Sequence, residues 1–94
     1  MYGLMNLERL PENYGMLFPF ARNEVIGMWM KNTLIPLDML FIDNNNLIVT
    51  IKTKTKPQSL DIISSKVPVT KVLEINAGLV KKFDIKIGNR IAIK

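Results

Sequence analysis

The sequence predicts one mainly β domain, either a small curled sheet or a partly closed β-barrel, with one short helix. Its 94 residues are the length of a single small domain, so we expect one domain over residues 1–94. Hydrophobic residues make up 48% of the chain and charged residues 22%, which is the balance of a folded globular protein. Short runs rich in β-branched residues recur between turn-forming residues and predict strands. Because a flat sheet would leave one apolar face uncovered in so short a chain, we expect the sheet to curve.

The first strand is expected over residues 15–18. Pro11, Gly15 and Pro19 interrupt any helix in the first part of the chain. The run GMLF at 15–18 is typical of a short buried strand. Pro19 either ends this strand or places it at the edge of a sheet, because proline cannot donate to a strand ladder.

The clearest local pattern is a β-hairpin in the middle of the chain. Two apolar runs, LDMLFI at 37–42 and LIVTIK at 47–52, are separated by DNNN at 43–46. Asn and Asp tolerate left-handed turn conformations, and the flanking runs are rich in strand-forming residues. The pattern therefore predicts two antiparallel strands joined by a tight turn.

Three lysines follow the hairpin at alternate positions. Lys52, Lys54 and Lys56 alternate with threonines, so in a continuing strand their ammonium groups would share one side, which must face water. This row could bind phosphates, but it lacks the interleaved aromatic side chains that single-strand binders use for base stacking. Lysines on exposed strands also block aggregation, and we favour this interpretation.

The rest of the chain predicts an irregular connection, a strand, a short helix, a turn and a last strand. In order, these elements cover residues 56–68, 69–75, 77–83, 84–89 and 90–94. Asn76 is expected to cap the helix, whose Leu79, Val80 and Phe83 fall on one apolar face at helical spacing. The residues expected to supply most of the core are Leu17, Phe18, Trp29, Leu37, Met39, Phe41, Ile48, Val72, Leu73, Ile75, Leu79, Val80, Phe83 and Ile91.

Histidine and cysteine are absent, and this excludes several chemistries. The chain cannot build a zinc finger, a Cys-His nucleophile pair, a Ser-His-Asp triad or a disulfide framework. Methionine thioethers could bind Cu(I), but most of the methionines lie in apolar runs and are expected in the core. We therefore expect no metal site and no cofactor.

The formal net charge of +5 permits attraction to anionic surfaces but does not require it. The joint enrichment of Ile, Asn and Lys is typical of an AT-rich genome, so we do not favour nucleic acid as a partner. No run approaches the roughly 18 uninterrupted apolar residues of a membrane-spanning helix, and the first residues lack the order of a signal peptide. We expect a soluble chain with no membrane span.

A mixture of aromatic and polar residues in a mostly apolar stretch is the strongest candidate for a site. Trp29 offers an aromatic surface and Lys31 a cation, while Asn32 adds an amide and Asp38 a carboxylate. In a straight strand neighbouring side chains point to opposite faces, but Pro36 bends the path and could bring Asp38 back toward Lys31 or Asn32. Alternatively, Trp29 anchors the core, Lys31 is solvated and Asp38 braces the turn.

The segment that carries these residues, MWMKNTLIPLDMLFID at 28–43, closely resembles the signature of the bacterial and archaeal proteins grouped as domain of unknown function family 192. Members of that family carry a Trp-Met-Lys-Asn-Thr core, then Ile-Pro-Leu-Asp and a Phe-Ile-Asp ending. Further similar segments, which extend the resemblance over nearly the whole chain, are residues 3–5, 10–11, 15–18, 72–78 and 85–88. The resemblance implies a small β-rich fold but no activity, because the activity of the family is not established.

The chain departs from the family pattern at three places. Met28 stands where an aromatic residue is expected, and Asn89 replaces an acid that is common after Gly88. The family also usually has a strand before its Gly-Leu-Met segment, often after an export signal, whereas here Met1 lies two residues before Gly3. We therefore expect an N-terminal strand and an export signal to be missing from this chain. The compartment stays open, although the resemblance favours an exported or periplasmic protein, and a missing strand would leave an open sheet edge through which a homodimer could form.

The leading functional hypothesis is a non-catalytic module that binds a small polar ligand or glycan in a cleft. Trp29 would supply a stacking surface, and the polar side chains near it would supply directional hydrogen bonds. The full set of candidate ligand-binding residues is Trp29, Lys31, Asn32, Asp38, Ser59 and Glu74.

Two other classes of function are kept beside it. A small enzyme could use Lys31 or Asp38 as general acid or base, with Glu74 as a second carboxylate. A serine nucleophile at Ser59 would need Lys31 as its base, and we do not favour this form of the enzyme hypothesis. In a purely structural or interaction domain, Asn32 and Asp38 would bond only to nearby backbone.

Overall fold

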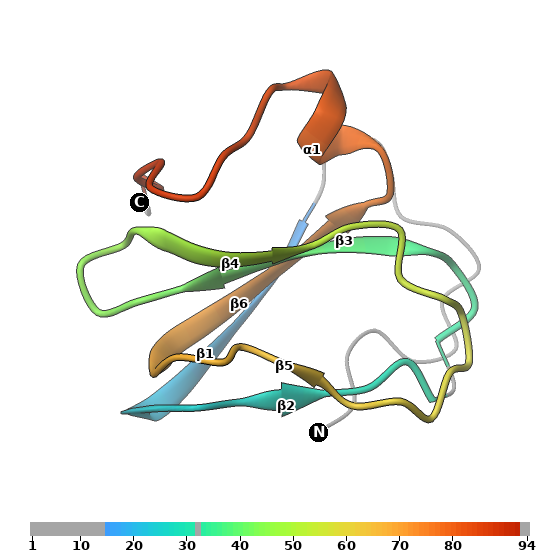
Figure 1. The fold of residues 1–94 in the computed structure, drawn as a ribbon, viewed down its shortest axis with the longest axis horizontal. Helices are drawn as coiled ribbons and strands as arrows, with labels where there is room; N and C mark the ends of the chain where they lie inside the picture. Colours follow the sequence, from blue (N-terminus) through green and yellow to red (C-terminus); the bar gives the residue numbers. More distant parts are fainter. Residues whose placement is uncertain (1–14, 32, 93–94) are drawn as a thin grey trace.

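Figure 1 shows the computed structural model of the chain, which describes residues 15–31 and 33–92. Its centre is a four-stranded antiparallel sheet with the strand order β1-β6-β3-β4. Strands β2 and β5 pair as a separate antiparallel ribbon. The elements are β1 (Gly15–Glu24), β2 (Gly27–Met28), β3 (Leu37–Ile42), β4 (Ile48–Lys52), β5 (Ile63–Ser64), β6 (Val69–Asn76) and α1 (Leu79–Lys82).

Both faces of the central sheet are covered. In Figure 1 the β2–β5 ribbon lies below the sheet, and α1 with the C-terminal segment lies above it. Along β3, Leu37, Met39 and Phe41 belong to one core cluster, which Met28 of β2 also joins. Leu40 belongs to a second cluster, together with the first residue of α1. Successive strand side chains point to opposite faces, so a strand buried on both faces needs the nearly continuous apolar run seen here.

The predicted fold class is confirmed. Strand is the main secondary structure of the described part of the chain, which has one short helix and forms a curled sheet that does not close into a barrel. Within the described residues, no helix has the length and apolar character that a bilayer crossing requires.

The predicted hairpin is also confirmed, as strands β3 and β4. Its turn is held by Asp43, whose Oδ1 accepts hydrogen bonds from the backbone N–H of Asn45 at 2.8 Å and of Leu47 at 3.0 Å. Asn46 adopts a left-handed φ of 63°, a conformation that asparagine reaches at lower cost than most residues. The turn residues therefore act as the sequence indicates.

Strand β1 is longer than predicted. It continues past Pro19 to Glu24, and its register with β6 shifts between these two residues. Pro19 is tolerated because β1 is an edge strand among the described residues. Leu17 was expected in the core but is 39% exposed, so this prediction is wrong. Its partner Leu73 packs against the second core cluster, which does not extend to the edge strand.

The helix starts later than predicted and is capped differently. Asn76 is the last residue of β6, and Gly78 holds the N-cap position with a left-handed φ of 97°. The prediction that Asn76 caps the helix is therefore wrong. Phe83 was expected in the core but is 62% exposed. It has already left helical geometry, at φ −101° and ψ 9°, so it does not share the inward face of Leu79.

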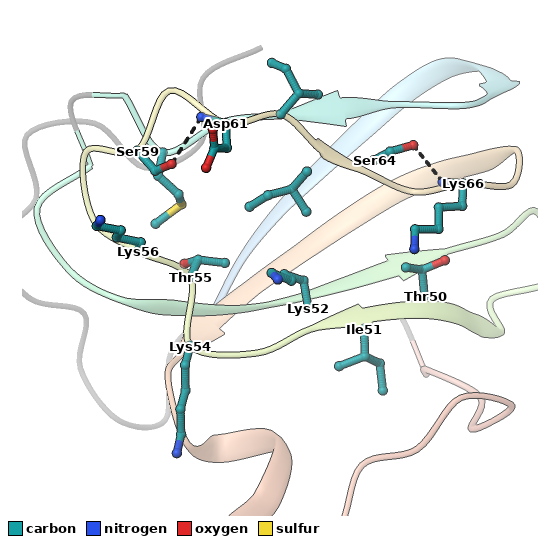
Figure 2. Close-up of a pocket in the computed structure, with 13 residues that line it drawn as sticks. Thr50, Ile51, Lys52, Lys54, Thr55, Lys56, Ser59, Asp61, Ser64 and Lys66 are labelled. Atoms are coloured by element: carbon teal, nitrogen blue, oxygen red, sulfur yellow. Dashed lines mark hydrogen bonds between the residues drawn. The ribbon is translucent and has the colours of Figure 1, made fainter.

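The lysine row does not form the single-sided strand that alternation predicts. Strand β4 ends at Lys52, and Lys54 adopts a left-handed φ of 50°. Figure 2 shows Lys54 pointing away from the side on which Lys56 lies. The expectation of three ammonium groups on one face is therefore wrong, because the backbone turns between them.

The last predicted strand, residues 90–94, is reduced in the described part of the chain to one isolated bridge between Leu47 and Arg90. Instead, the turn at residues 84–89 forms hydrogen bonds with the first residue of β4. Ile48 donates to the carbonyl of Asn89 at 2.9 Å and accepts from the N–H of Gly88 at 2.8 Å. Residues 93 and 94 lie outside the described residues.

Candidate functional site

A cleft of about 400 Å³ opens between β4, the segment that follows β4 and the connection that contains β5 (Figure 2). The connection was expected to be irregular throughout, but it forms β5 and pairs with β2. The residues that line the cleft are Met30, Thr50, Ile51, Lys52, Lys54, Thr55, Lys56, Ser59, Asp61, Ile62, Ile63, Ser64 and Lys66.

Thr55 fixes one wall of the cleft. Its side chain is 2% exposed, and its Oγ1 accepts from the N–H of Leu37 and donates to the carbonyl of Leu37, both at 3.0 Å. The backbone N–H of Thr55 also donates to that carbonyl, at 2.8 Å. Three hydrogen bonds therefore tie the segment after β4 to the first residue of β3, and they fix the backbone between Lys54 and Lys56.

Ser65 fixes the opposite wall. It is fully buried, and its Oγ accepts from the N–H of Ile26 at 3.0 Å and donates to the carbonyl of Val67 at 2.7 Å. Its backbone N–H donates to the carbonyl of Ile26 at 2.9 Å. The hydroxyl of Thr50 on β4 donates to the carbonyl of Ser65. This wall is thus joined to the residue that precedes β2 and to β4.

Lys66 reaches across the cleft from that wall. Its φ of 67° is left-handed, and its backbone N–H donates to Ser64 Oγ at 2.9 Å. Figure 2 shows its side chain extending toward Thr50. The turn that Ser64 stabilises therefore aims a cation at the strand on the other side.

Two serine hydroxyls at the cleft can still donate a hydrogen bond. Ser59 Oγ accepts from the N–H of Asp61 at 3.1 Å, and Ser64 Oγ accepts from the N–H of Lys66. Each of these hydroxyls keeps its own proton for a further partner, because a hydroxyl can accept and donate at the same time.

The charge of the cleft is positive. Four lysines, Lys52, Lys54, Lys56 and Lys66, line it, against one carboxylate, Asp61, and of these lysines Lys54 turns its side chain away from the cleft (Figure 2). None of these four ammonium groups forms an ion pair with a carboxylate of the described residues. Lysine charges in a concave site raise the local concentration of anions. The arrangement can therefore bind an anionic group by charge and by hydroxyl donors.

Asp38 lies elsewhere, at a second hollow of about 220 Å³ beside α1. The residue is fully buried, and its carboxylate accepts three backbone hydrogen bonds. Oδ1 accepts from Lys54 at 2.9 Å, and Oδ2 accepts from Gly78 at 3.0 Å and from Val80 at 2.9 Å. A single side chain thus joins β3 to the segment after β4 and to the start of the helix.

The other predicted site residues are dispersed. Lys31 Nζ lies 5.8 Å from the centroid of the Trp29 ring, which is within cation–π distance. Glu74 is fully buried on β6, opposite Met39 of β3. Neither Trp29, Lys31 nor Glu74 lines either of the two hollows. Asn32 lies outside the described residues.

Of the predicted site residues that the structure describes, only Ser59 lines the cleft that contains Lys52, Lys56 and Lys66, called the lysine cleft below. The structure therefore places Ser59 near Lys52 rather than near Asp38. Lys66, Ser64 and Asp61 were not among the predicted residues. The sequence feature that could have indicated them is a pair of basic segments, the lysine row at 52–56 and the Ser-Ser-Lys run at 64–66. These two segments flank the connection that forms one side of the cleft. Ligand binding by the dispersed residues stays a prediction.

Comparison with known proteins gives a family and two similar structures. A family model described as uncharacterized ACR, DUF192, matches residues 1–93. A structure of a proposed transcription regulator from Sinorhizobium meliloti 1021 is 46% identical, with a TM-score of 0.91, and the match covers 94% of this chain and 68% of that chain. A structure of a protein of unknown function from Novosphingobium aromaticivorans DSM 12444 is 32% identical, with a TM-score of 0.93, and covers 97% of this chain and 65% of that chain.

This chain thus spans about two thirds of the length of each of the two similar structures. The search of curated proteins found no match. Because the family model extends over nearly the whole sequence, the chain belongs to the DUF192 family.

Proposed function

We propose that this domain is a non-catalytic binding module whose lysine cleft holds a small polar ligand that carries negative charge. The observation that carries the proposal is the excess of cations in a concave site. Lys52, Lys56 and Lys66 line the cleft, and none of them is neutralised by a described carboxylate. An anion there gains from several ammonium groups at once.

The polar groups favour an anion over a neutral glycan. The hydroxyls of Ser59 and Ser64 have protons left to donate, whereas the hydroxyl of Thr50 already donates to the backbone. Among the described residues that line the cleft, none is aromatic, so a sugar ring would find no stacking platform. A volume of about 400 Å³ suits a small molecule.

The geometry around Asp38 supports a structural role for this carboxylate rather than acid–base catalysis. All three of its described hydrogen bonds come from the backbone, and they lie within 3.0 Å. Lys31 lies over the Trp29 ring and lines neither hollow. The hypothesis of an enzyme that uses Lys31 and Asp38 together therefore has less support than a binding module.

Nucleic acid is the second candidate partner. One similar structure belongs to a proposed transcription regulator, and lysines can contact phosphates. The absence of aromatic side chains among the described cleft residues argues against base stacking on single strands. Binding of a short DNA duplex with a steep dependence on salt would favour this candidate over a small ligand.

A homodimer through an open sheet edge is kept as a proposal. In the described part of the chain, β1 forms one edge of the central sheet. Analytical ultracentrifugation at several concentrations tests it, and a single monomeric species throughout would contradict it.

Titration calorimetry with citrate, a compact multivalent carboxylate, tests the proposed function. We expect binding to the wild-type protein and a loss of about 1–3 kcal/mol, or about 5- to 150-fold in Kd, in the double variant Lys52→Gln/Lys66→Gln. Lys82→Gln is the control, because Lys82 is an exposed lysine on α1 outside the cleft. The cleft variant removes two positive charges, so the matched control is the double variant Lys82→Gln/Lys86→Gln, in which Lys86 is another exposed lysine.

Equal weakening by the cleft variant and by the control pair would mean that net charge, not the cleft, attracts citrate. No measurable binding of citrate, phosphate or sulfate would overturn the proposed function.

A further inference from the structure

We infer that the ligand of the lysine cleft is an aliphatic carboxylic acid, with its carboxylate at the lysines and its alkyl chain on an isoleucine wall. The inference rests on the proposed function and names the ligand class. The residues that line the cleft are of two kinds. Some are cations and hydroxyl donors, and others are the apolar side chains of Met30, Ile62 and Ile63, of which the two isoleucines form what we call the isoleucine wall.

The isoleucine wall is built by the backbone around β2 and β5. Ile62 is 60% exposed although it lines the cleft. A Cβ at Gly27 would lie 2.9 Å from Ile62 Cγ2, so the glycine leaves room for this side chain to rest against β2. Ile63 pairs across the ribbon with Met28 and packs against the first core cluster. Ile62 therefore offers apolar surface to the cleft from a fixed position.

Exposed apolar surface of this kind is stabilised when it is covered. Contact between the Ile62 side chain and water is unfavourable, and an alkyl chain that covers this side chain removes part of that contact and so lowers the free energy. Met30 also lines the cleft but is fully buried, so the exposed apolar surface of the wall comes mainly from Ile62. A compact anion such as phosphate would leave this wall uncovered.

The charged end is held by a strained turn. Lys66 adopts a left-handed φ of 67°, where glycine would be the less strained residue. Its side chain extends across the cleft toward Thr50, and Lys52 lies on the same strand as Thr50 (Figure 2). A carboxylate between Lys66 and Lys52 would accept charge-assisted hydrogen bonds from both ammonium groups.

The test is a chain-length series of linear carboxylates, namely acetate, butanoate, hexanoate and octanoate. Binding is followed by NMR titration of the wild-type protein, at concentrations below micelle formation. We expect the Kd to fall about two- to fourfold for each added methylene until the chain outgrows the cleft, since a buried methylene contributes about a factor of four in affinity. The end of the series should then show a plateau.

Two variants assign the effect to the proposed wall. Ile62→Ser should flatten the dependence on chain length and leave acetate affinity within about twofold. Ile87→Ser is the matched control, because Ile87 is 64% exposed and does not line the cleft. Both residues are exposed, so neither change is expected to unfold the protein.

Each outcome separates the two proposals. Carboxylate affinity that does not change with chain length, while citrate still binds, would overturn the inference and leave the proposed function standing. Failure of citrate and of every member of the series to bind would overturn both. A chain-length dependence that Ile62→Ser leaves intact would also overturn the inference, because the alkyl chain would then lie elsewhere.

Discussion

Asp38 provides the sharpest test of how this fold is held together. Its buried carboxylate accepts hydrogen bonds from the backbone N–H groups of Lys54, Gly78 and Val80. A hydrogen bond to a charged group contributes about 1.5–3 kcal/mol, so three would sum to about 4.5–9 kcal/mol in a dry site. The donors belong to residues that are partly or fully exposed, and water can replace some of the lost bonds. We therefore expect Asp38→Ala to lower the free energy of unfolding by about 3–5 kcal/mol.

Urea denaturation followed by the fluorescence of Trp29, the single tryptophan of the chain, measures this change. A domain of this length has a total stability of about 5–14 kcal/mol, so the variant should lose a large part of it. Asp38→Asn should lie between the wild type and Asp38→Ala, because the amide keeps one accepting oxygen but turns an N–H toward a backbone donor. Asp61→Ala, at an exposed carboxylate, is the control and should change stability by less than about 0.5 kcal/mol. A loss below about 1 kcal/mol for Asp38→Ala would refute the three-donor geometry.

Three further predictions concern the core, the cleft wall and electrostatics. Phe41→Ala removes a fully buried ring from the first core cluster and should destabilise by about 3–5 kcal/mol in the same urea assay, and a loss under about 1 kcal/mol would mean that the ring is not packed there. Thr55→Val leaves the N–H of Leu37 without its side-chain acceptor and should destabilise by about 1–3 kcal/mol, whereas Thr53→Val, at an exposed position, should not. Citrate affinity should fall as ionic strength rises from about 0.02 M to about 0.5 M, because salt screens the exposed lysines, and an unchanged Kd in calorimetry would argue against charge as the main source of binding.

The elements that could be predicted from the sequence are those with strong local signals. The β3–β4 hairpin follows from two β-branched runs and the Asp43–Asn46 turn, whose hydrogen bonds form within four residues. Strand β6 follows in the same way from its apolar run. In these segments the local conformational preference agrees with the tertiary structure, so the strands could be predicted without knowing which distant residues they contact.

The errors lie where tertiary contacts decide. Leu17 belongs to an apolar strand run, but the second core does not reach the edge strand on which it lies. Phe83 fits a helical face only if the helix continues, and α1 ends before it. The prediction that Asn76 caps the helix is wrong because Asn76 is the last residue of β6, and Gly78, with its left-handed φ, is the N-cap instead. Each of these depends on where a neighbouring element stops.

The site was predicted only in part for the same reason. The candidate around Trp29 and Asp38 assumed that one bent segment collects its own polar groups, but Asp38 is used by backbone groups up to 42 residues away in the chain. The cleft combines Lys52 with Ser59 and Lys66, which come from a strand and a loop that only the fold brings together. Lysine alternation indicated that the region is basic, but not which lysines face a common space.

The most direct test of the central claim, that this cleft binds an anion, is an NMR titration of isotope-labelled protein with citrate. We expect saturable shifts of the backbone amides to concentrate on β4 and on residues 59–66, with little change at the indole of Trp29. Saturable shifts centred on Trp29 and Lys31, or no saturable shift anywhere in the chain, would contradict the claim.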